Sequence, residues 1–383
     1  MDLDAFFCAC EELNDPSLRG TTFAVGGSAD RRGVIASCSY AARAVGVHSA
    51  MPTSQALRLC PTLKLIQGRH ADYSAISKKV MKILTDTSPF MEQVSIDEAF
   101  LDISCLREGS YETAAAIQNE VRDSLGLPCS LGAASNKLVA KMANTIGKKS
   151  IRTMTYPQSI KYIPDGEEAA FLAPLAVGKL WGIGEATEKR LRGLGVATIG
   201  QLAQYPVEPL VKQFGKMGYE LHEHANGRDD TPVRTEREDP KSVSQEYTFK
   251  RDESDEQELL LRLLRQSEQV GARLRKHGLK GNTVHLKLRW ADFRTVTRQA
   301  HLTEPMNRES VIYEQAKALF LAAWKPDCLP IRLIGLGVSG FDSDTGQLSF
   351  FTNPNAEKED RLLKAVDDIR GKYGRDIIKR GKW

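Results

Sequence analysis

Two adjacent acids, Asp97 and Glu98, lie inside the apolar segment "VSIDEAFLDIS" at 94–104. Successive side chains of a regular strand point to opposite faces, so a flat strand cannot bring both carboxylates to one site. If "MEQVS" and "AFLDIS" form a hairpin, both acids lie at its tip, where turn dihedrals can aim them at a common point. We therefore predict a hairpin with Asp97 and Glu98 at the turn.

The N-terminal segment "MDLDAFF" supplies further acids, Asp2 and Asp4, on one face of a predicted neighbouring strand. Clustered carboxylates repel one another and have raised pKa values unless a cation compensates, and their oxygens are ligands that suit Mg²⁺. Three carboxylates that hold two metal ions about 4 Å apart are suited to in-line displacement at phosphorus. The spacing does not separate Asp2 from Asp4, and it leaves open that these acids are simply exposed to water.

The segments around these acids predict an α+β domain. Residues 71–86 and 112–125 space their apolar residues three and four apart, which is typical of amphipathic helices. After them, "CSLGAAS" predicts a short strand and "NKLVAKMANTIGKK" a helix. The spacing of Cys8 and Cys10, two residues apart, favours one face of a strand over a metal site.

A helical region and then a charged linker follow. Residues 165–228 predict helices throughout, with the glycines of "GIG" near the start. Residues 229–242 are charged, contain two prolines and have no periodicity, so they predict a linker.

The next hundred residues predict a second α+β unit. Its expected elements are a strand (243–249), a helix (254–276), two strands (283–291 and 295–302), a helix (309–323) and a strand (331–341). This βαββαβ order is the split, ferredoxin-like pattern. A tail from residue 342 ends in a predicted helix.

The strand "TVHLKLRWA" alternates apolar and polar residues. Val284, Leu286, Leu288 and Trp290 alternate with Thr283, His285, Lys287 and Arg289. One face is expected to pack on helices, and the other is basic and suits a nucleic-acid backbone. Between positions 276 and 298 the basic residues are Lys276, Lys280, Lys287, Arg289, Arg294 and Arg298, against the single acid Asp292. A basic face that is merely solvated remains the alternative.

Bulk properties narrow the class of protein. A chain of 383 residues is expected to form two to four domains, and its net charge of +4 alone indicates no partner. No apolar run reaches the roughly 18–20 residues that span a bilayer, and the N-terminus lacks the basic region of a secretory signal. We expect a cytosolic protein.

Five collinear segments resemble the Y family of translesion DNA polymerases, and most of all its bacterial DNA polymerase IV branch. They are "DLDAFFCACEELNDPSLRG", "SYAARAVGVHSAMP", "VSIDEAFLDIS", "SNKLVAKMAN" and "WGIGEATEKRLRGLG", and the resemblance covers residues 1–341. It implies a multidomain α+β fold with the shape of a right hand. The implied parts are a ferredoxin-like palm (1–11 and 71–160), small fingers (12–70), a helical thumb (161–230), a linker (231–241), a βαββαβ little finger (242–341) and a C-terminal tail (342–383).

The resemblance also implies the reaction. A Y-family polymerase adds deoxynucleotides to a primer 3′ end by two-metal phosphoryl transfer, with low fidelity and without proofreading, and it bypasses damaged template bases. In this chain the metal-binding carboxylates would be Asp2, Asp97 and Glu98, with the backbone carbonyl of Leu3, and the cofactor two Mg²⁺ ions. Asp4 is expected not to be a primary ligand. The resemblance places several apolar residues before the first catalytic aspartate, whereas only Met1 precedes Asp2. Either the start is truncated or misassigned, or this strand is very short.

The resemblance assigns nucleotide contacts to several parts of the chain. The segment "ASCSYAAR" would supply Ser37, Tyr40 and Arg43 for the triphosphate. Lys148 would also reach the phosphates, and the adjacent Lys149 is the alternative for this contact. Phe7 matches an aromatic steric gate that excludes a 2′-hydroxyl, while Phe6 is expected in the core.

DNA and clamp contacts are implied as well. Gly182 and Gly184 would grip a DNA backbone through a helix-hairpin-helix, and Lys287, Arg289 and Arg298 are expected to contact DNA. The segment "QLSFF" resembles a sliding-clamp motif, formed by Gln347, Leu348, Phe350 and Phe351. The expected partners are primer-template DNA, deoxynucleoside triphosphates and a sliding clamp, bound by a monomer on the bacterial nucleoid.

Two other readings stay open. One is a DNA-binding or clamp-binding accessory protein with a degenerate active site, and the other is a palm-type nucleotidyl cyclase. An intact set of Asp2, Asp97 and Glu98 argues against the first. A cyclase needs the same acids but neither a helix-hairpin-helix nor a basic sheet.

Overall fold

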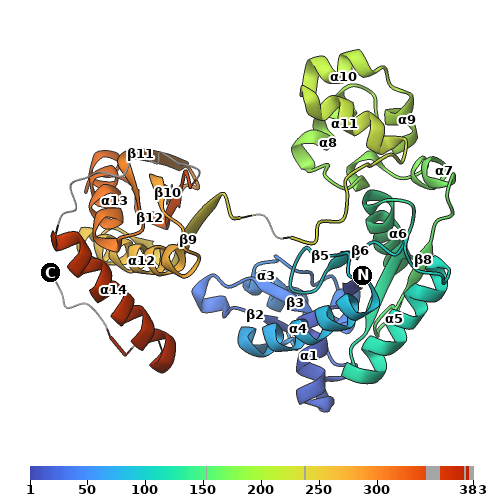
Figure 1. The fold of residues 1–383 in the computed structure, drawn as a ribbon, viewed down its shortest axis with the longest axis horizontal. Coiled ribbons are helices and arrows are strands. Elements are labelled where there is room, and N and C mark those ends of the chain that lie inside the picture. Colours follow the sequence, from blue (N-terminus) through green and yellow to red (C-terminus); the bar gives the residue numbers. More distant parts are fainter. Residues whose placement is uncertain (152, 237–238, 342–353, 375–376, 379–383) are drawn as a thin grey trace. The chain divides into compact units, whose positions relative to one another are not determined.

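The structure, a computed structural model, describes residues 1–151, 153–236, 239–341, 354–374 and 377–378. The chain forms two compact units, Met1–Arg237 and Glu238–Trp383. Figure 1 shows their elements. The division falls inside the stretch that the sequence predicts to be a linker. No helix among the described residues is long and apolar enough to cross a membrane.

The first unit is organised by a sheet that carries the acids. Strand β1 (Asp2–Leu3) pairs antiparallel with β7 (Cys129–Ala133), and β7 pairs parallel with β8 (Ile160–Tyr162). The predicted hairpin is confirmed as β5 (Met91–Gln93) and β6 (Ala99–Leu101), with both acids between the two strands or at their boundary. It is joined to β1 by a bridge between Asp2 and Glu98.

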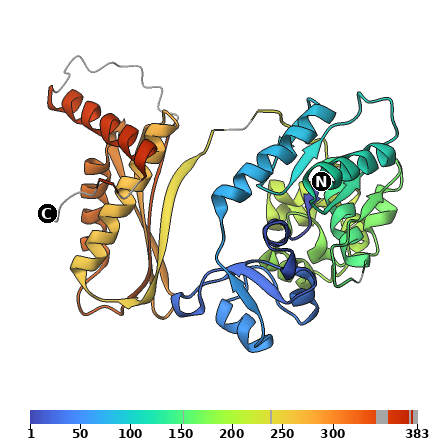
Figure 2. The same ribbon diagram turned by 90° about the horizontal axis from the view of Figure 1, so that it is seen from below.

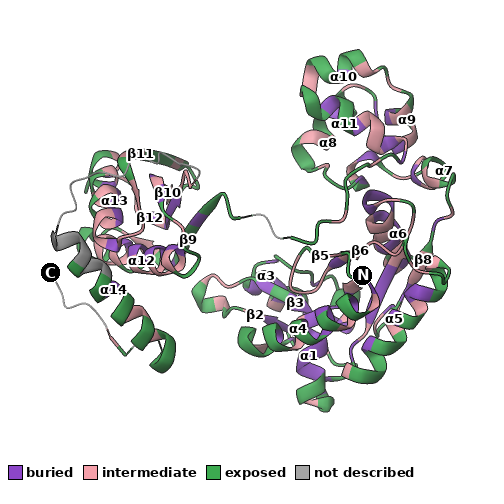
Figure 3. Ribbon diagram, in the orientation of Figure 1, coloured by how far each residue is buried: buried purple, intermediate pink, exposed green. Residues whose placement is uncertain are grey.

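Helices predicted on either side of the hairpin pack on this sheet. They are α4 (His70–Thr87) and α5 (Ser110–Leu125), and both match the predicted ranges closely. Their buried residues, including Tyr73, Val80 and Ile117, join one core with the strands. In Figure 3 much of the surface of these helices is exposed. Among the neighbouring strands, β7 is the one with three buried residues in a row, Cys129, Ser130 and Leu131.

The expectation that Cys8 and Cys10 lie on a strand is wrong. Both are buried in helix α1 (Phe6–Asn14), because β1 ends at Leu3 and Ala5, with φ 44°, turns the chain into the helix. Six residues of this nine-residue helix are buried. A helix enclosed on most sides lacks the alternation of apolar and polar residues that marks an amphipathic helix. The same turn removes Asp4 from the strand that was expected to carry it with Asp2.

The fingers segment forms its own small sheet and core. Strand β2 (Phe23–Gly26) lies between β3 (Ile35–Cys38) and β4 (Lys64–Ile66), antiparallel to the first and parallel to the second. The short helices of this segment are η1 (Pro16–Leu18), η2 (Ala29–Arg31), α2 (Tyr40–Ala44) and α3 (Thr53–Leu59). Ala24, Ile35 and Ala42 lie in their shared core.

Helix α6 (Lys137–Ser150) connects the sheet to the predicted helical region. Its apolar residues, Leu138 and Met142 among them, share a core with that region. The helices there are α7 (Glu168–Leu172), η3 (Val177–Lys179), α8 (Glu185–Gly193), α9 (Ile199–Gln204), α10 (Val207–Phe214) and α11 (Lys216–Ala225), which confirms the all-helical expectation.

The first part of the predicted linker is anchored on the first unit. Lys137 Nζ donates to the carbonyl of Pro232 at 3.3 Å, and the amide of Arg234 donates to Glu92 Oε2 at 2.8 Å. Lys137 also pairs with Glu92 at 2.6 Å and is only 9% exposed. The linker is therefore held through its backbone, by the charged side chains of Lys137 and Glu92.

The second unit has the predicted βαββαβ order. Its elements are β9 (Ser242–Glu253), α12 (Glu256–Lys276), β10 (Gly281–Trp290), β11 (Thr295–Met306), α13 (Glu309–Ala323) and β12 (Ile331–Ser339). The strands lie in the order β11-β10-β12-β9, all antiparallel. In Figure 2 the helices of this unit cover one face of its sheet. Val284, Leu286 and Leu288 are buried against them, as the alternation predicts.

The predicted tail helix is confirmed as α14 (Pro354–Tyr373). It is attached to the helices of the second unit through Arg275 of α12. The guanidinium group contacts Asp367 at 2.6 and 3.0 Å and Glu309 at 3.0 Å. Leu363 of α14 is 2% exposed.

Candidate active site

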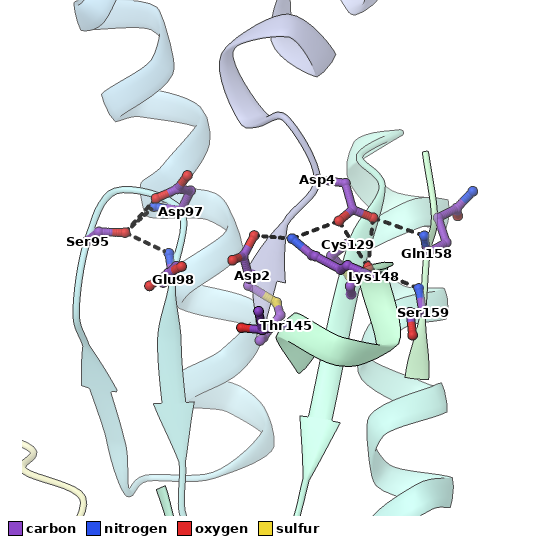
Figure 4. Close-up of polar contacts among 12 residues, drawn as sticks. Asp2, Asp4, Ser95, Asp97, Glu98, Cys129, Thr145, Lys148, Gln158 and Ser159 are labelled. Carbon is purple, nitrogen blue, oxygen red and sulfur yellow. Dashed lines mark hydrogen bonds and ion pairs between the residues drawn. The ribbon is translucent and has the colours of Figure 1, made fainter. Parts of the chain in front are cut away.

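The acids of the hairpin and of β1 come together through backbone pairing. The amide of Leu3 donates to the carbonyl of Asp97 at 2.9 Å, and Asp2 bridges Glu98. At the hairpin tip, Ser95 Oγ accepts hydrogen bonds from the amides of Asp97 (3.2 Å) and Glu98 (3.0 Å) and donates to Asp97 Oδ1 at 2.5 Å. Figure 4 shows the hairpin tip beside Asp2. Residues 94 and 96 positions apart in the chain are thus held in register.

Two lysines from α6 neutralise these acids. The ammonium group of Lys148 contacts Asp2 and lies 2.8 Å from Asp4 Oδ1, between the two carboxylates (Figure 4). Lys141 contacts Glu98. Lys141 is not among the site residues predicted from the sequence. Its position seven residues before Lys148, which puts both on one helix face, is the signal that could have found it.

A glycine lets α6 approach the sheet closely enough for these contacts. A Cβ atom at Gly132 of β7 would lie 2.0 Å from the carbonyl oxygen of Ala140 and 2.5 Å from the amide nitrogen of Asn144. Any side chain there would push α6 away from the strand. Gly132 thus sets the distance between the lysines and the acids.

The pKa values of the two neighbouring carboxyl groups, Asp2 and Glu98, are shifted in opposite directions. Burial and then contact with Asp2 raise the pKa of Glu98, and Lys141 offsets only part of this. Burial also opposes ionisation of Asp2, but Lys148 and contact with Glu98 outweigh it and lower the pKa of Asp2. Burial likewise disfavours the charge of Lys148, yet Asp2 and Asp4 prevail and raise its pKa. Lys148 is therefore cationic at neutral pH. Of the two carboxyl groups, Glu98 is the one whose neighbouring cation does not fully compensate its burial and its contact with Asp2.

Asp4 has a different environment from Asp2. It is fully buried, and both of its oxygens accept from Ser130 Oγ at 2.9 Å. One of them also accepts from the amide of Gln158 at 3.0 Å. With Lys148 bound as well, the Asp4 carboxylate ties three segments of the palm together.

The donor chemistry of Asp2, Asp97 and Glu98 fits a divalent cation, although their side chains are not gathered into one set of ligands. Among the described residues, no three His, Cys, Asp or Glu side chains are grouped closely enough to hold a metal ion. Hard carboxylate oxygens nevertheless suit Mg²⁺, and two ammonium groups already bind Asp2 and Glu98 as cations. A bound metal ion would favour the ionised form of Glu98, whose pKa is raised by burial and then by contact with Asp2.

The fingers residues differ in accessibility. Helix α2 begins at Tyr40, and the guanidinium carbon of Arg43 lies 4.6 Å from the centre of the Tyr40 ring, as the spacing of three predicts. Arg43 is exposed and Tyr40 half-buried, whereas Ser37 is only 6% exposed. Burial, and then the charge of Asp4, raise the pKa of Tyr40 to about 12. This electrostatic coupling places Tyr40 near the acids.

The two adjacent aromatic residues of α1, Phe6 and Phe7, differ in burial, as expected. Phe6 is 2% exposed in the core, whereas Phe7 is only partly buried. Lys148 and Lys149 separate in the same way, since Lys149 is exposed and Lys148 lies among the acids.

The predicted helix-hairpin-helix turn lies between η3 and α8. Gly182 has φ +92°, a conformation that L side chains rarely adopt, and Gly184 is the N-cap of α8. The first turn of α8 also carries Glu185 and Glu188, which offset the positive end of the helix dipole.

The basic residues of the second unit do not all share one face. Lys287 is paired with Thr297 and Arg289 with Thr295, so these four side chains lie on the face without helices. Arg298 is paired with Leu286, so it lies on the helix-facing side, between Val296 and Ala300 on edge strand β11. Lys287 is also bound to Glu246 at 2.7 Å. The clamp-motif residues Gln347, Leu348, Phe350 and Phe351 lie outside the described residues.

Family models match three parts of the chain. Residues 1–145 match the impB/mucB/samB family and residues 240–350 match its C-terminal domain. Residues 178–229 match a model described as the DNA polymerase-iota thumb domain. The three matched regions correspond to the sheet with the acids, the helical region and the βαββαβ unit.

Curated relatives match along the entire chain. A DNA polymerase IV of Dehalococcoides mccartyi is 37% identical over 385 residues, covering 100% of this chain and 96% of the relative. A DNA polymerase IV of Clostridium kluyveri is 36% identical and covers the same shares.

Solved structures share the fold. A chimera of the Y-family DNA polymerases Dbh and Dpo4 superposes with a TM-score of 0.77 at 24% identity, covering 89% of this chain and 98% of that chain. DinB from Sulfolobus solfataricus gives a TM-score of 0.57 at 22% identity, with 89% and 97% covered.

Proposed function

The chain belongs to the Y family of DNA polymerases, within the DNA polymerase IV branch, and on this premise we propose which residues carry out its reaction. It is a translesion polymerase that extends DNA under the direction of a template. Low fidelity and the absence of proofreading belong to the proposal. The accessory-protein alternative is not favoured.

Y-family polymerases depend on metal ions. We propose that Asp2, Asp97 and Glu98, with the carbonyl of Leu3, hold two Mg²⁺ ions. When bound, these ions stabilise the negative charge that develops on phosphate oxygens during displacement. Lys141 and Lys148 hold the carboxylates of Glu98 and Asp2 in place at the site.

The chain's own residues position the incoming nucleotide. Lys148 supplies a fixed ammonium group beside the acids, where it can contact triphosphate oxygens. Arg43 supplies a planar guanidinium group on the exposed side of α2, and Tyr40 orients it through ring contact. Ser37 is assigned a hydroxyl contact, and Phe7 closes the space under the sugar.

DNA contacts are proposed on both units. The backbone amides of the turn at Gly182 and Gly184 can donate to a phosphate at the start of α8. On the sheet face without helices, Lys287 and Arg289 would neutralise phosphates. Arg298 would act from the other side of edge strand β11. We further propose a monomer that meets DNA in the bacterial cytoplasm and docks on a sliding clamp through "QLSFF".

One observation supports the metal assignment: backbone bonds between β1 and the hairpin tip bring the main chains of Asp2, Asp97 and Glu98 side by side. The test is primer extension with Mg²⁺ on a templated DNA duplex. We expect Asp97→Ala and Glu98→Ala to lower turnover by about 10³-fold or more, because transition-state charge loses its stabilisation. Binding of primer-template should change by only a few-fold.

Asp102→Ala is the matched control. Asp102 lies on the same hairpin, but its carboxylate accepts from the amide of Ser104 at 2.9 Å. This variant should extend primers at a near-normal rate. Near-normal turnover of the Asp97 or Glu98 variant would show that the metal assignment is wrong.

A further inference from the structure

The ring of Phe7 is packed against a buried tyrosine from another part of the chain. Tyr73 of α4 is fully buried, and its ring stacks on Phe7 with centroids 4.6 Å apart and an interplanar angle of 17°. His70, one turn earlier in α4, contacts Phe7 edge-on at 5.7 Å and 90°. Phe7 thus contacts two rings of α4 in addition to that of its neighbour Phe6.

The tyrosine is itself fixed by a charged group on the helix that carries Phe7. The hydroxyl of Tyr73 donates to Glu11 Oε1. Glu11 lies four residues after Phe7 in α1, so both side chains lie on one side of that helix. Tyr73 therefore contacts α1 twice, by stacking at Phe7 and by a hydrogen bond at Glu11.

Arg69 completes the arrangement. Its Nε donates to Glu11 Oε1 at 3.2 Å and its Nη2 to Oε2 at 2.9 Å, the two-point geometry that holds a carboxylate plane in one orientation. The Glu11 side chain is only 7% exposed, so this pair is shielded from solvent on the carboxylate side. Arg69 supplies the countercharge to this buried carboxylate.

We propose that Glu11, Arg69 and Tyr73 are positioning residues that hold the Phe7 ring rigid and thereby set the discrimination against ribonucleotides. The inference rests on the proposed role of Phe7 as the gate for the sugar. A ring excludes a 2′-hydroxyl only if it cannot move aside when the larger sugar binds. Phe7 is the second residue of α1, two residues after the left-handed Ala5, and its ring packs against side chains from α4.

The expected size of the effect follows from the stacking contact. The stacking free energy of an aromatic pair corresponds to about a three- to tenfold change in a ratio of rates. This is the largest loss of selectivity that we expect when the restraint on Phe7 is removed. Tyr73→Phe keeps the ring but loses the bond to Glu11. Glu11→Ala loses the tyrosine bond and the arginine pair together. Glu11→Gln keeps an acceptor oxygen for Tyr73.

The experiment measures the ratio of kcat/KM for a ribonucleotide to kcat/KM for the matching deoxynucleotide in primer extension. Tyr73→Phe and Glu11→Ala should raise this ratio about threefold or more, and Glu11→Gln should raise it less. A general loss of stability lowers both efficiencies and leaves the ratio unchanged. Tyr313→Phe, a half-buried tyrosine in the second unit, is the matched control and should leave the ratio as it is.

A Phe7→Ala background separates this inference from its premise. There, Tyr73→Phe should raise the ratio no further, because the ring that it restrains is gone. If Phe7→Ala raises the ratio but Tyr73→Phe does not, the positioning role is refuted and the gate stands. If Phe7→Ala itself leaves the ratio unchanged, the gate assignment fails. Should Glu11→Ala not fold, Tyr73→Phe decides the question alone.

Discussion

The ammonium group of Lys148 binds the carboxylate of Asp2 across 146 positions of the sequence. The same group also contacts Asp4, and Gly132 allows α6 to lie close enough for both contacts. Because Asp2 and Asp4 raise the pKa of Lys148, it carries its charge at neutral pH. A fixed cation beside the acids that we propose to bind metal is suited to the phosphates of an incoming nucleotide.

Replacing this cation should therefore impair nucleotide addition. We expect Lys148→Ala to reduce kcat/KM for deoxynucleotides by about 10²-fold, since one preorganised donor to developing charge is lost. Lys149→Ala is the matched control, because Lys149 is exposed and adjacent. Single-turnover primer extension measures both. Equal losses in the two variants would contradict the assignment.

Phe7→Ala should weaken sugar discrimination. Removing the ring leaves room for a 2′-hydroxyl, so ribonucleotide incorporation should rise by about tenfold or more, while deoxynucleotide incorporation changes much less. Competing incorporation into one primer measures the ratio. Tyr313→Phe, at a half-buried tyrosine of the second unit, is the control and should leave selectivity unchanged. Unchanged selectivity in a folded, active Phe7→Ala enzyme would refute the gate.

Neutralising the open sheet face should change the salt dependence of DNA binding. Lys287→Ala with Arg289→Ala should reduce the slope of log K against log salt by roughly one to two units, because fewer counterions are released. Arg298→Ala, on the helix-facing side of β11, is compared at the same salt concentrations. An unchanged slope in the double variant would show that this face is merely solvated.

The clamp motif lies outside the described residues, so its prediction rests on sequence. Leu348→Ala with Phe351→Ala should abolish the stimulation of synthesis by a sliding clamp and leave clamp-free distributive synthesis intact, because two apolar anchors of a docking peptide are lost. Processivity with and without clamp is the measurement. Equal losses in both assays would instead indicate a role of the tail in folding.

Local patterns in the sequence determined much of this protein. The hairpin with its acids, the amphipathic helices α4 and α5 and the βαββαβ order all follow from periodicity and turn preference, which act over a few residues. The resemblance of five segments, also a property of the sequence, indicated the family. The helix α1 was not predicted from the sequence, because a helix that is buried on most sides has no polar stripe to mark its period.

Only the tertiary structure decided which distant groups meet. Strand register put Arg298 opposite Leu286 and away from the face of Lys287. The approach of α6 to β7 at Gly132 brought Lys141 to Glu98 and left Lys149 in solvent. The physical reason is that strand register and helix–strand distance are set by packing across the core, among residues that the linear spacing of the chain does not relate.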